Sequence, residues 1–324
     1  MIDMTSMNIR NWSRMGSRGA FNQALLALFE TEERAVVLTA DMYSCSVQEA
    51  FRTQYADRLY NMGIAEQNMV AVAAGLAREG FVPFAATFAT FAVMRSAEQI
   101  KICMGYMGLG VKLVGFVSGY SVGILGPTHT CLEDIAVMRA IPNVVILSPA
   151  DCTATVKATL ASARMDAPVY LRLTGSANCP IVYKQDFDFE IGRAITLREG
   201  TDISLIATGS MVYVALKAAA QLAESGISAE VVDMHTIRPI DKEAIERACS
   251  KKLIVTLEEH SVAGGLGSAV AEVLAEESSR PVQLMLGAEG PYPHAADYPA
   301  LLENSGLTPP RVAARISQTY KELF

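Results

Sequence analysis

The chain has 324 residues, of which 51% are hydrophobic and 19% are charged, and its net charge at pH 7 is −7. This length allows two domains with separate cores, whereas no apolar run approaches the roughly 20 residues of a membrane-spanning helix. The negative charge without a basic cluster argues against nucleic-acid binding, and the N-terminal residues lack the apolar core of a signal peptide, which predicts a cytoplasmic protein.

Cysteine usage predicts neither a zinc site nor a disulfide framework. The six cysteines are scattered, and no two are spaced as a CxxC pair. Either kind of site would show a regular cysteine spacing. The residues concerned are Cys45, Cys103, Cys131, Cys152, Cys179 and Cys249.

In chain order, the first half alternates helical patterns with apolar runs. Helical spacing of apolar residues occurs at 18–30, 65–79, 91–104, 132–140 and 151–164. The short apolar runs between these segments are typical of buried parallel strands. They are AVVLTA (35–40), VPFAA (82–86), VKLVGFV (111–117), NVVILS (143–148) and VYLRL (169–173).

The second half repeats this alternation after a break. From about 174 to 190 the chain loses its periodicity and gains polar and turn residues, which predicts a linker. Beyond it we expect strands at 202–208, 228–234, 252–259 and 282–286, and helices at 211–225, 241–250, 266–278 and 308–322. Such alternation favours layered α/β units. We therefore expect two three-layer α/β domains with mainly parallel sheets, at residues 1–185 and 190–324.

One carboxylate stands out in the stretch NMGIAEQNMVAVAAGL (61–76). Glu66 lies at the start of an expected helix whose other positions are almost all small or apolar. Burying a charge at such a place is costly unless the charge has a partner. Glu66 is therefore a candidate functional residue, although an acidic residue that caps its helix is the structural alternative.

Other candidates follow the expected strands of the first domain. Asp41 comes directly after 35–40, Phe88 and Phe91 follow 82–86, and His129 ends the glycine-punctuated loop GILGPTH (123–129). Ligands of parallel α/β sheets bind beyond the carboxyl ends of the strands. Each residue also has an ordinary structural interpretation: a turn for Asp41, core packing for the rings and a structural role for a lone histidine.

The sequence contains in order Arg18, Asp41, GIAEQN (63–68), TFATF (87–91), GPTH (126–129), LEDIAVMRAIPNV (132–144), SPAD (148–151), EVVDMHTIRPID (230–241) and LEEHSVAGGLGSA (257–269). In the order and spacing of these motifs, the chain resembles the transketolases. Residues 1–185 resemble their pyrimidine-binding domain and residues 192–324 their C-terminal domain. No GDG motif with a following Asn occurs, and in this family that motif holds the metal and the diphosphate. The chain therefore resembles the C-terminal subunit of a split transketolase that needs an N-terminal partner subunit.

The resemblance implies roles around thiamine diphosphate and Mg²⁺. Glu66 would hydrogen-bond N1′ of the aminopyrimidine, and His129 would lie near the aminopyrimidine and the reacting carbons. Phe88 and Phe91 would wrap the pyrimidine, with Phe91 as the stacking ring. Asp41 would lie near the cationic thiazolium. Mg²⁺ would be held mainly by the partner subunit, so no metal ligand is expected in this chain.

The substrate end departs from the family's pattern. Ordinary transketolases carry a histidine at the position of Val117 and an acidic residue at that of Leu125, and both bind sugar hydroxyls. Gly175 replaces a phosphate-binding arginine, whereas Arg18 is kept as the expected cationic contact; Arg172, nearby in sequence, fits a structural ion pair. Because unpaired hydroxyls are costly in a buried site, we expect a non-standard substrate. Candidates are a branched ketose phosphate such as apulose 4-phosphate, a sulfonated ketose such as sulfofructose, or a smaller unphosphorylated ketol.

Three functions remain open from the sequence. The first is transfer of a two-carbon ketol unit from a ketose to an aldehyde or ketone acceptor, by an α2β2 assembly with the N-terminal subunit. The second is the β subunit of a 2-oxo acid or acetoin dehydrogenase, although GPTH and RAIPN fit transketolases better. The third is a non-catalytic partner subunit, against which Glu66, Phe91 and His129 argue together.

The second domain contains one further pattern. Glu258 to His260, followed by Gly264, Gly265 and Gly267, resembles an anion-binding turn before a helix. A strand-to-helix connection in which glycines permit close packing is the interpretation that we favour.

Overall fold

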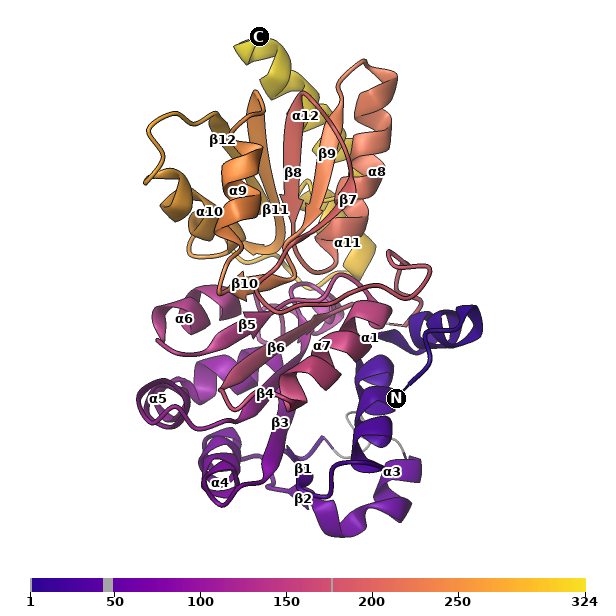
Figure 1. The fold of residues 1–324 in the computed structure, drawn as a ribbon, viewed down its shortest axis with the longest axis vertical. Helices are drawn as coiled ribbons and strands as arrows, with labels where there is room; N and C mark the ends of the chain where they lie inside the picture. Colours follow the sequence, from indigo (N-terminus) through magenta and orange to yellow (C-terminus); the bar gives the residue numbers. More distant parts are fainter. Residues whose placement is uncertain (1, 43–48, 176) are drawn as a thin grey trace.

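The computed structural model describes residues 2–42, 49–175 and 177–324. It shows two α/β domains stacked end to end, with the C-terminus at the far end of the second domain (Figure 1). Each domain has a central, mainly parallel sheet with helices on both faces, which confirms the predicted fold class.

In the described residues the first sheet has seven strands in the order β10-β5-β6-β4-β3-β1-β2. Every neighbouring pair is parallel except β10 with β5. The strands are β1 (Ala35–Thr39), β2 (Leu59–Asn61), β3 (Val82–Phe88), β4 (Lys112–Ser118), β5 (Val145–Leu147), β6 (Val169–Thr174) and β10 (Thr236–Arg238).

Alternate side chains of this sheet face two different helical layers. Val37, Phe84 and Val114 pack against α1 (Ser6–Phe29) and α7 (Cys152–Ala163). Leu38 and Ala85 face the other layer, as expected from the period of two in a strand. That layer contains α4 (Glu66–Arg78), the π-helix η2 (Phe91–Arg95), α5 (Ala97–Gln99), the π-helix η3 (Ile100–Tyr106) and α6 (Asp134–Ala140). The remaining helices of the first domain are α3 (Glu49–Gln54), η1 (Ala56–Arg58) and η4 (Gly123–Leu125).

The second sheet has the order β12-β11-β8-β9-β7 and is parallel except where β7 pairs with β9. Its strands are β7 (Ile195–Arg198), β8 (Ile203–Ala207), β9 (Ala229–Asp233), β11 (Leu253–Ser261) and β12 (Val282–Ala288). Two helices, α8 (Met211–Glu224) and α12 (Pro309–Leu323), cover one face. The opposite face packs on α9 (Lys242–Ala248) and α10 (Leu266–Leu274), and α11 (Tyr298–Asn304) lies near the domain boundary (Figure 1).

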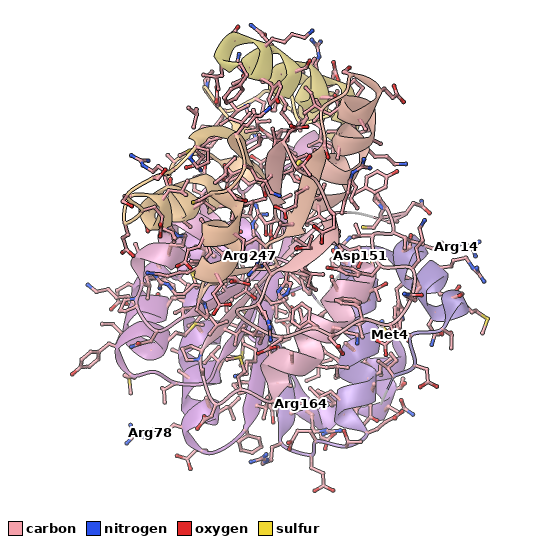
Figure 2. All side chains as sticks on the ribbon, turned by 45° about the horizontal axis from the view of Figure 1, so that its top comes forward. Met4, Arg14, Arg78, Asp151, Arg164 and Arg247 are labelled. Carbon is pink, nitrogen blue, oxygen red and sulfur yellow. The ribbon has the colours of Figure 1, made fainter. Side chains whose placement is uncertain are left out.

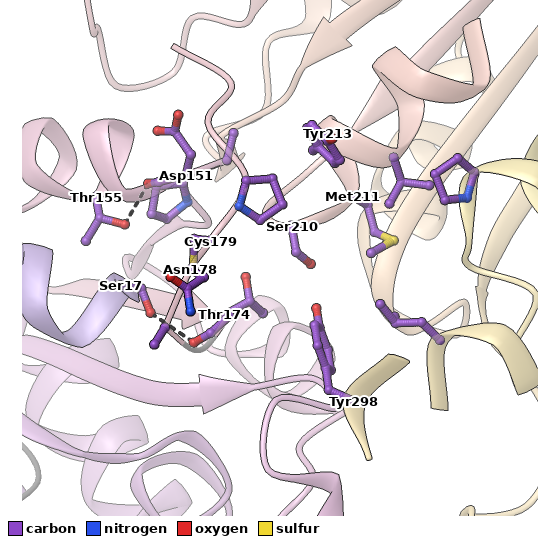
Figure 3. Close-up of a pocket in the computed structure, with 18 residues that line it drawn as sticks. Ser17, Asp151, Thr155, Thr174, Asn178, Cys179, Ser210, Met211, Tyr213 and Tyr298 are labelled. Atoms are coloured by element: carbon purple, nitrogen blue, oxygen red, sulfur yellow. Dashed lines mark hydrogen bonds between the residues drawn. The ribbon is translucent and has the colours of Figure 1, made fainter. Parts of the chain in front are cut away.

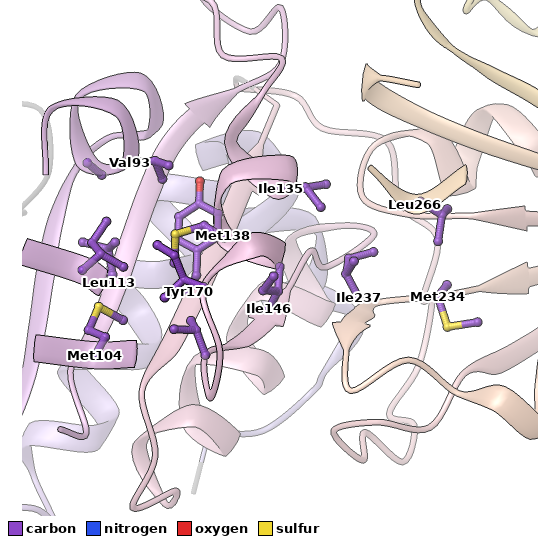
Figure 4. Packing of buried hydrophobic residues seen from close by; sticks show 14 of the residues in the cluster. Val93, Met104, Leu113, Ile135, Met138, Ile146, Tyr170, Met234, Ile237 and Leu266 are labelled. Atoms are coloured by element: carbon purple, nitrogen blue, oxygen red, sulfur yellow. The ribbon is translucent and has the colours of Figure 1, made fainter. Parts of the chain in front are cut away.

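One hydrophobic core continues from the first domain into the second. Met138 and Ile146 of the first domain belong to the same buried cluster as Met234, Ile237 and Leu266 of the second (Figure 4). Burial of apolar surface is the main favourable term in association. The domains are therefore joined by packing as well as by the connecting chain.

A buried polar cluster also crosses this boundary. Arg172 Nε donates to Asp134 Oδ2 at 2.8 Å, and the Tyr170 hydroxyl donates to the same oxygen at 2.6 Å. From the second domain, the carbonyl of Glu259 accepts from Arg172 Nη2 at 2.8 Å. The side chains of Arg172 and Asp134 are 1% and 0% exposed, so the ion-pair role expected for Arg172 is confirmed.

Most expected elements are present, and the differences have physical causes. The helix expected at 18–30 begins at Ser6, where Thr5 Oγ1 accepts from the Asn8 amide, and it bends at Gly16 with φ of 78°. Exposed residues in its first turns hide the apolar period. The strands β2, β7 and β10, and the helices α3 and α11, were not expected because each is short. The segment expected as a helix at 91–104 is largely π-helical.

The described residues also bear on membrane-spanning helices and on the cysteines. In the three described ranges, no helix combines the length and apolar character that crossing a membrane requires. Five of the cysteines are free thiols, namely Cys103, Cys131, Cys152, Cys179 and Cys249. Cys45 lies outside the described residues.

Candidate active site

Four of the predicted site residues lie at or beyond the carboxyl ends of three neighbouring strands. Asp41 follows β1, Phe88 and Phe91 end and follow β3, and the loop leading to His129 follows β4. The three strands are adjacent in the order β4-β3-β1. All of them are parallel, so their carboxyl ends lie at one edge of the sheet, where ligands of such sheets bind.

Three rings meet at this edge. His129 stands edge-on to Phe91, with ring centroids 5.3 Å apart, and to Phe88, with centroids 6.0 Å apart. The two phenylalanine rings are 6.1 Å apart and tilted by 37°. The Thr128 hydroxyl lies 2.9 Å from His129 Nδ1, at hydrogen-bonding distance. The predicted aromatic pair and the predicted histidine thus form one cluster.

Glu66 is the first residue of α4 and is 5% exposed. Its Oε1 accepts a hydrogen bond of 2.8 Å from Arg95 Nη1. The same guanidinium lies over the Phe91 ring, 4.0 Å from the centroid. Glu66 therefore joins the ring cluster through Arg95, and these two residues line a cavity of about 450 Å³ together with Ile64, Ala65 and Gln67.

Asp41 is tied to the loop that leads into α4. Its amide donates to Asn61 Oδ1 at 3.0 Å, and Asn61 Nδ2 donates to Asp41 Oδ1 at 3.3 Å. Asn61 Oδ1 also accepts from the Gly63 amide at 3.0 Å. Asp41 is exposed and has a φ of 52°, a conformation that Asp tolerates better than most residues. Asn61 thus connects Asp41 with the segment that positions Glu66.

Arg18 is the predicted residue that these contacts do not reach. It is half-buried on α1, after the bend at Gly16. The neighbouring Ser17 hydroxyl donates to the Gly175 carbonyl at 3.3 Å, beyond the end of β6. Ser17 and Gly175 line a separate cavity of about 340 Å³ between the domains, together with Cys179 and Tyr298 (Figure 3). This cavity contains none of the predicted catalytic residues.

The loop before His129 is shaped by close packing on the second domain. A Cβ at Gly123 would clash with the Leu301 side chain and lie 3.0 Å from the Ala296 carbonyl oxygen, so any larger residue would have to displace its neighbours. The loop exposes Ile124 and Leu125, which are 74% and 50% exposed. Val117 differs, because it is buried in the core on the α1 side and has a φ of 52°. Of the two departures at the expected hydroxyl-binding positions, Leu125 is therefore the accessible one.

The glycine-rich turn of the second domain is structural. Glu258 accepts from the amides of Leu266 and Gly267 at 2.7 and 2.8 Å. These amides open α10, so a carboxylate of the chain itself occupies the helix N-terminus. Burial raises the pKa of Glu258 to about 7. The interpretation as a strand-to-helix connection is supported.

Sequence reasoning missed two residues of the site. Arg95 lies four positions after Phe91, a spacing that places both side chains on one side of a helix. Asn61 opens the stretch that contains Glu66, and its amide holds both Asp41 and Gly63. The spacing from Phe91 to Arg95 could have indicated the contact between these two side chains, whereas nothing in the sequence pairs Asn61 with Asp41.

Comparison with known proteins places this geometry in a family. The family model "Transketolase, pyrimidine binding domain" matches residues 13–179, and "Transketolase, C-terminal domain" matches residues 192–312. The chain belongs to the transketolase family. It is thus an enzyme subunit of a transferase family that depends on thiamine diphosphate, as the motifs predicted.

Several relatives of this transketolase-family chain are subunits of divided enzymes. The 6-deoxy-6-sulfo-D-fructose transketolase subunit SqwH of Clostridium sp. (strain MSTE9) is 40% identical over 82% of this chain and 83% of the relative. A subunit of the apulose-4-phosphate transketolase of Phocaeicola vulgatus is 41% identical over 80% of this chain and 83% of the relative. These relatives do not favour the dehydrogenase or the non-catalytic alternative.

Solved structures agree with this placement. A structure described as "Split gene transketolase, inactive beta4 tetramer" is 40% identical, covers 94% of this chain and 97% of its own, and superposes with a TM-score of 0.84. Transketolase from Campylobacter jejuni shares the fold with a TM-score of 0.79 at 22% identity, over 94% of this chain and 46% of its own.

Proposed function

We propose that the chain is the C-terminal subunit of a heteromeric transketolase, which transfers a two-carbon ketol unit from a ketose donor to an aldehyde or ketone acceptor. The observation that carries this proposal is the Glu66 carboxylate, 5% exposed at the start of α4 and open to a cavity beside Phe91. The family match and the divided relatives support it.

The residues present fit the pyrimidine half of thiamine diphosphate. A flat heteroaromatic ring needs an aromatic wall and an in-plane hydrogen-bonding group, which Phe88, Phe91 and Glu66 supply. In the described ranges, no group of three or more His, Cys, Asp or Glu side chains is arranged to hold a metal ion. We propose that an N-terminal partner subunit mainly holds Mg²⁺ and the diphosphate.

The chain's own residues would then orient the cofactor and move protons. When bound, thiamine diphosphate supplies the electron sink for breaking a carbon–carbon bond. Glu66 would hold the proton at N1′, and the Phe91 ring would fix the plane of the pyrimidine. The contact of 2.9 Å between Thr128 and His129 Nδ1 leaves Nε2 to exchange a proton with the substrate. Asp41 would lie near the cationic thiazolium.

The substrate end supports a non-standard ketose. Leu125 is 50% exposed where a hydroxyl-binding acid is expected, so a sugar hydroxyl at that place would lose a partner. The two relatives named for sulfofructose and apulose 4-phosphate suggest a sulfonated or branched donor. Arg18 is the cationic contact that we propose for its sulfonate or phosphate.

Assembly, location and domain limits complete the proposal. The active unit would be an α2β2 assembly in the cytoplasm, with the pyrimidine site between the two kinds of subunit. The chain would divide into a pyrimidine-binding domain at residues 1–185 and a C-terminal domain at 190–324, which agrees with family matches at 13–179 and 192–312.

A binding and turnover experiment tests this function. Thiamine diphosphate with Mg²⁺ would be titrated calorimetrically into this chain, into an N-terminal transketolase subunit from the same organism, and into their mixture. We expect tight binding only in the mixture, followed by cleavage of sulfofructose or apulose 4-phosphate in a donor screen with an aldose phosphate acceptor. Binding without ketose cleavage would limit the proposal to the cofactor, and no binding would contradict it.

A further inference from the structure

Arg95 makes two contacts with the proposed cofactor site. Its Nη1 donates to Glu66 Oε1 at 2.8 Å, and its guanidinium lies over the Phe91 ring, 4.0 Å from the centroid. Both contacts come from η2, whose π-helical residues run from Phe91 to Arg95. Short π-helical segments occur often at functional sites. One planar cation therefore joins the carboxylate to the ring.

These two groups are the ones that a bound aminopyrimidine would need. The proposed function uses the Glu66 carboxylate for a hydrogen bond to N1′ and the Phe91 ring for stacking. A ring face in contact with a guanidinium cannot hold a second planar group at the same place. Glu66 Oε1 is also occupied, by the hydrogen bond from Arg95 Nη1. A pyrimidine that stacked on this face of Phe91 and bonded to this oxygen of Glu66 would therefore compete with Arg95 for one place.

Exposure shows how this competition can be resolved. The Arg95 side chain is 48% exposed, whereas that of Glu66 is 6% exposed. Both residues line a cavity with a volume of about 450 Å³. The arginine can therefore turn into solvent without disturbing the core, whereas the carboxylate stays fixed at the start of α4.

We propose that Arg95 occupies the aminopyrimidine place in the free subunit. It pairs with Glu66 and covers Phe91 until the cofactor displaces its guanidinium. This inference rests on the proposed function and adds that cofactor binding works against Arg95. The Arg95 guanidinium is half-exposed, so its ion pair and its cation–π contact are each modest. We therefore expect the displacement to lower cofactor affinity by about tenfold.

Cofactor affinity in Arg95 variants tests this inference. Thiamine diphosphate with Mg²⁺ would be titrated calorimetrically into the assembled enzyme, made from this chain and the N-terminal subunit. We expect Arg95→Ala to bind about tenfold more tightly than the unmodified enzyme. Arg95→Gln should change affinity in the same direction, and Arg95→Lys should restore most of the original affinity, because it keeps the charge opposite Glu66.

The matched control is Arg78→Ala. Arg78 lies in the last turn of α4, at the opposite end from Glu66, and projects at the outer edge of the molecule (Figure 2). This variant should leave the affinity unchanged. Thermal unfolding of every variant checks that the fold is kept. A merely structural role for Arg95 predicts weaker binding after its removal, which is the opposite sign.

The outcomes separate this inference from the proposed function. If the unmodified enzyme binds the cofactor and neither Arg95→Ala nor Arg95→Gln binds it more tightly, the inference fails while the function stands. If the unmodified enzyme does not bind it, both fail. A crystal structure of the loaded enzyme gives a second readout, and a guanidinium still over Phe91 and bonded to Glu66 would overturn the inference.

Discussion

The His129 imidazole stands edge-on to the Phe91 ring, with centroids 5.3 Å apart and ring planes at 71°. This is one of the favoured arrangements of aromatic pairs. His129 ends a loop after β4, whereas Phe91 opens a π-helix after β3. The position of the His129 imidazole, the proposed proton-transfer group, is therefore set by a ring in the segment that follows the neighbouring strand β3.

Phe91→Leu should weaken cofactor binding by about tenfold, because the aromatic contribution beyond buried area is about 0.5–1.5 kcal/mol. The expected measurement is calorimetric titration of thiamine diphosphate with Mg²⁺ into the assembled enzyme. Phe81→Leu is the control, because Phe81 is 39% exposed and directly precedes the first residue of β3, at the end of the strand opposite to the site. Equal affinities for the two variants would contradict stacking on Phe91.

Glu66→Gln should lower turnover by about 10²- to 10⁴-fold, the usual size of a lost proton-transfer group. The amide is close in size to the carboxylate, so assembly and cofactor binding should persist. Steady-state ketose cleavage and size-exclusion chromatography measure the two properties. Glu79→Gln, at the other end of α4, keeps full activity if the effect belongs to the site. Unchanged turnover in Glu66→Gln would favour a non-catalytic subunit.

Leu125→Asp should shift donor preference toward ordinary ketose phosphates. Leu125 is 50% exposed in the loop before His129, so a carboxylate can be introduced there without burial. A new partner for a sugar hydroxyl is expected to raise kcat/KM for fructose 6-phosphate by about tenfold relative to the native donor. The comparison variant is Ile124→Asp, at the adjacent exposed residue. An equal shift in both variants would indicate a general charge effect.

Arg172→Met should destabilise the fold by about 3–5 kcal/mol, because it leaves the buried Asp134 without its cation. Asp134 would keep only the 2.6 Å hydrogen bond from the Tyr170 hydroxyl among the bonds described above. Denaturant unfolding gives the free-energy change. Combining Arg172→Met with Asp134→Asn should recover part of the loss. If the double variant is as unstable as the sum of the single ones, the two residues do not act as a pair.

Asp233 should make a contribution to stability that decreases as pH rises from about 4 to about 7. Burial raises the pKa of this carboxyl from 3.8 to about 7. In this window the folded chain retains a proton that the unfolded chain releases, so unfolding becomes more favourable with rising pH. Asp233→Asn should flatten the profile and be more stable than the unmodified chain at pH 8. The Tyr183 hydroxyl, 2.7 Å from Oδ2, keeps an acceptor in the amide.

The measurement is the free energy of unfolding from pH 4 to pH 8. Some slope should remain in Asp233→Asn, because burial also raises the pKa of Glu258 to about 7. Asp188→Asn serves as the exposed control and should reproduce the original profile. An unchanged profile in Asp233→Asn would show that this carboxyl does not retain its proton in the folded chain.

The parts of the fold that sequence could predict are those with a local signal. Buried parallel strands such as β4 are continuous apolar runs, and α4 keeps a helical period through Met69, Val70 and Ala73. The convergence of Phe91 and His129 was also predictable, because both follow strands of one parallel sheet. The functional assignment of these residues depended on family resemblance rather than on their spacing.

What escaped prediction depends on contacts between distant segments. Arg95 is an exposed charged residue on a helix, and such residues are ordinary, so its sequence context does not reveal the contact with Glu66. The hydrogen bonds between Asn61 and Asp41 join the ends of two strands. β10 has only three residues, and its partner β5 lies in the other domain's sheet. No local pattern encodes such pairings.

The pairing of β10 with β5 also affects how the chain folds during its synthesis. Thr236 of β10 lies opposite Leu147 of β5, and β10 is the outermost strand on one side of the first sheet. The same sheet carries the proposed site. During translation at about 5–20 residues per second, the edge of β5 stays uncovered for on the order of 10 s after β5 leaves the ribosome. An open strand edge can pair with other chains. The nascent first domain therefore has a period of exposure to misassembly that ends only when the second domain supplies its strand.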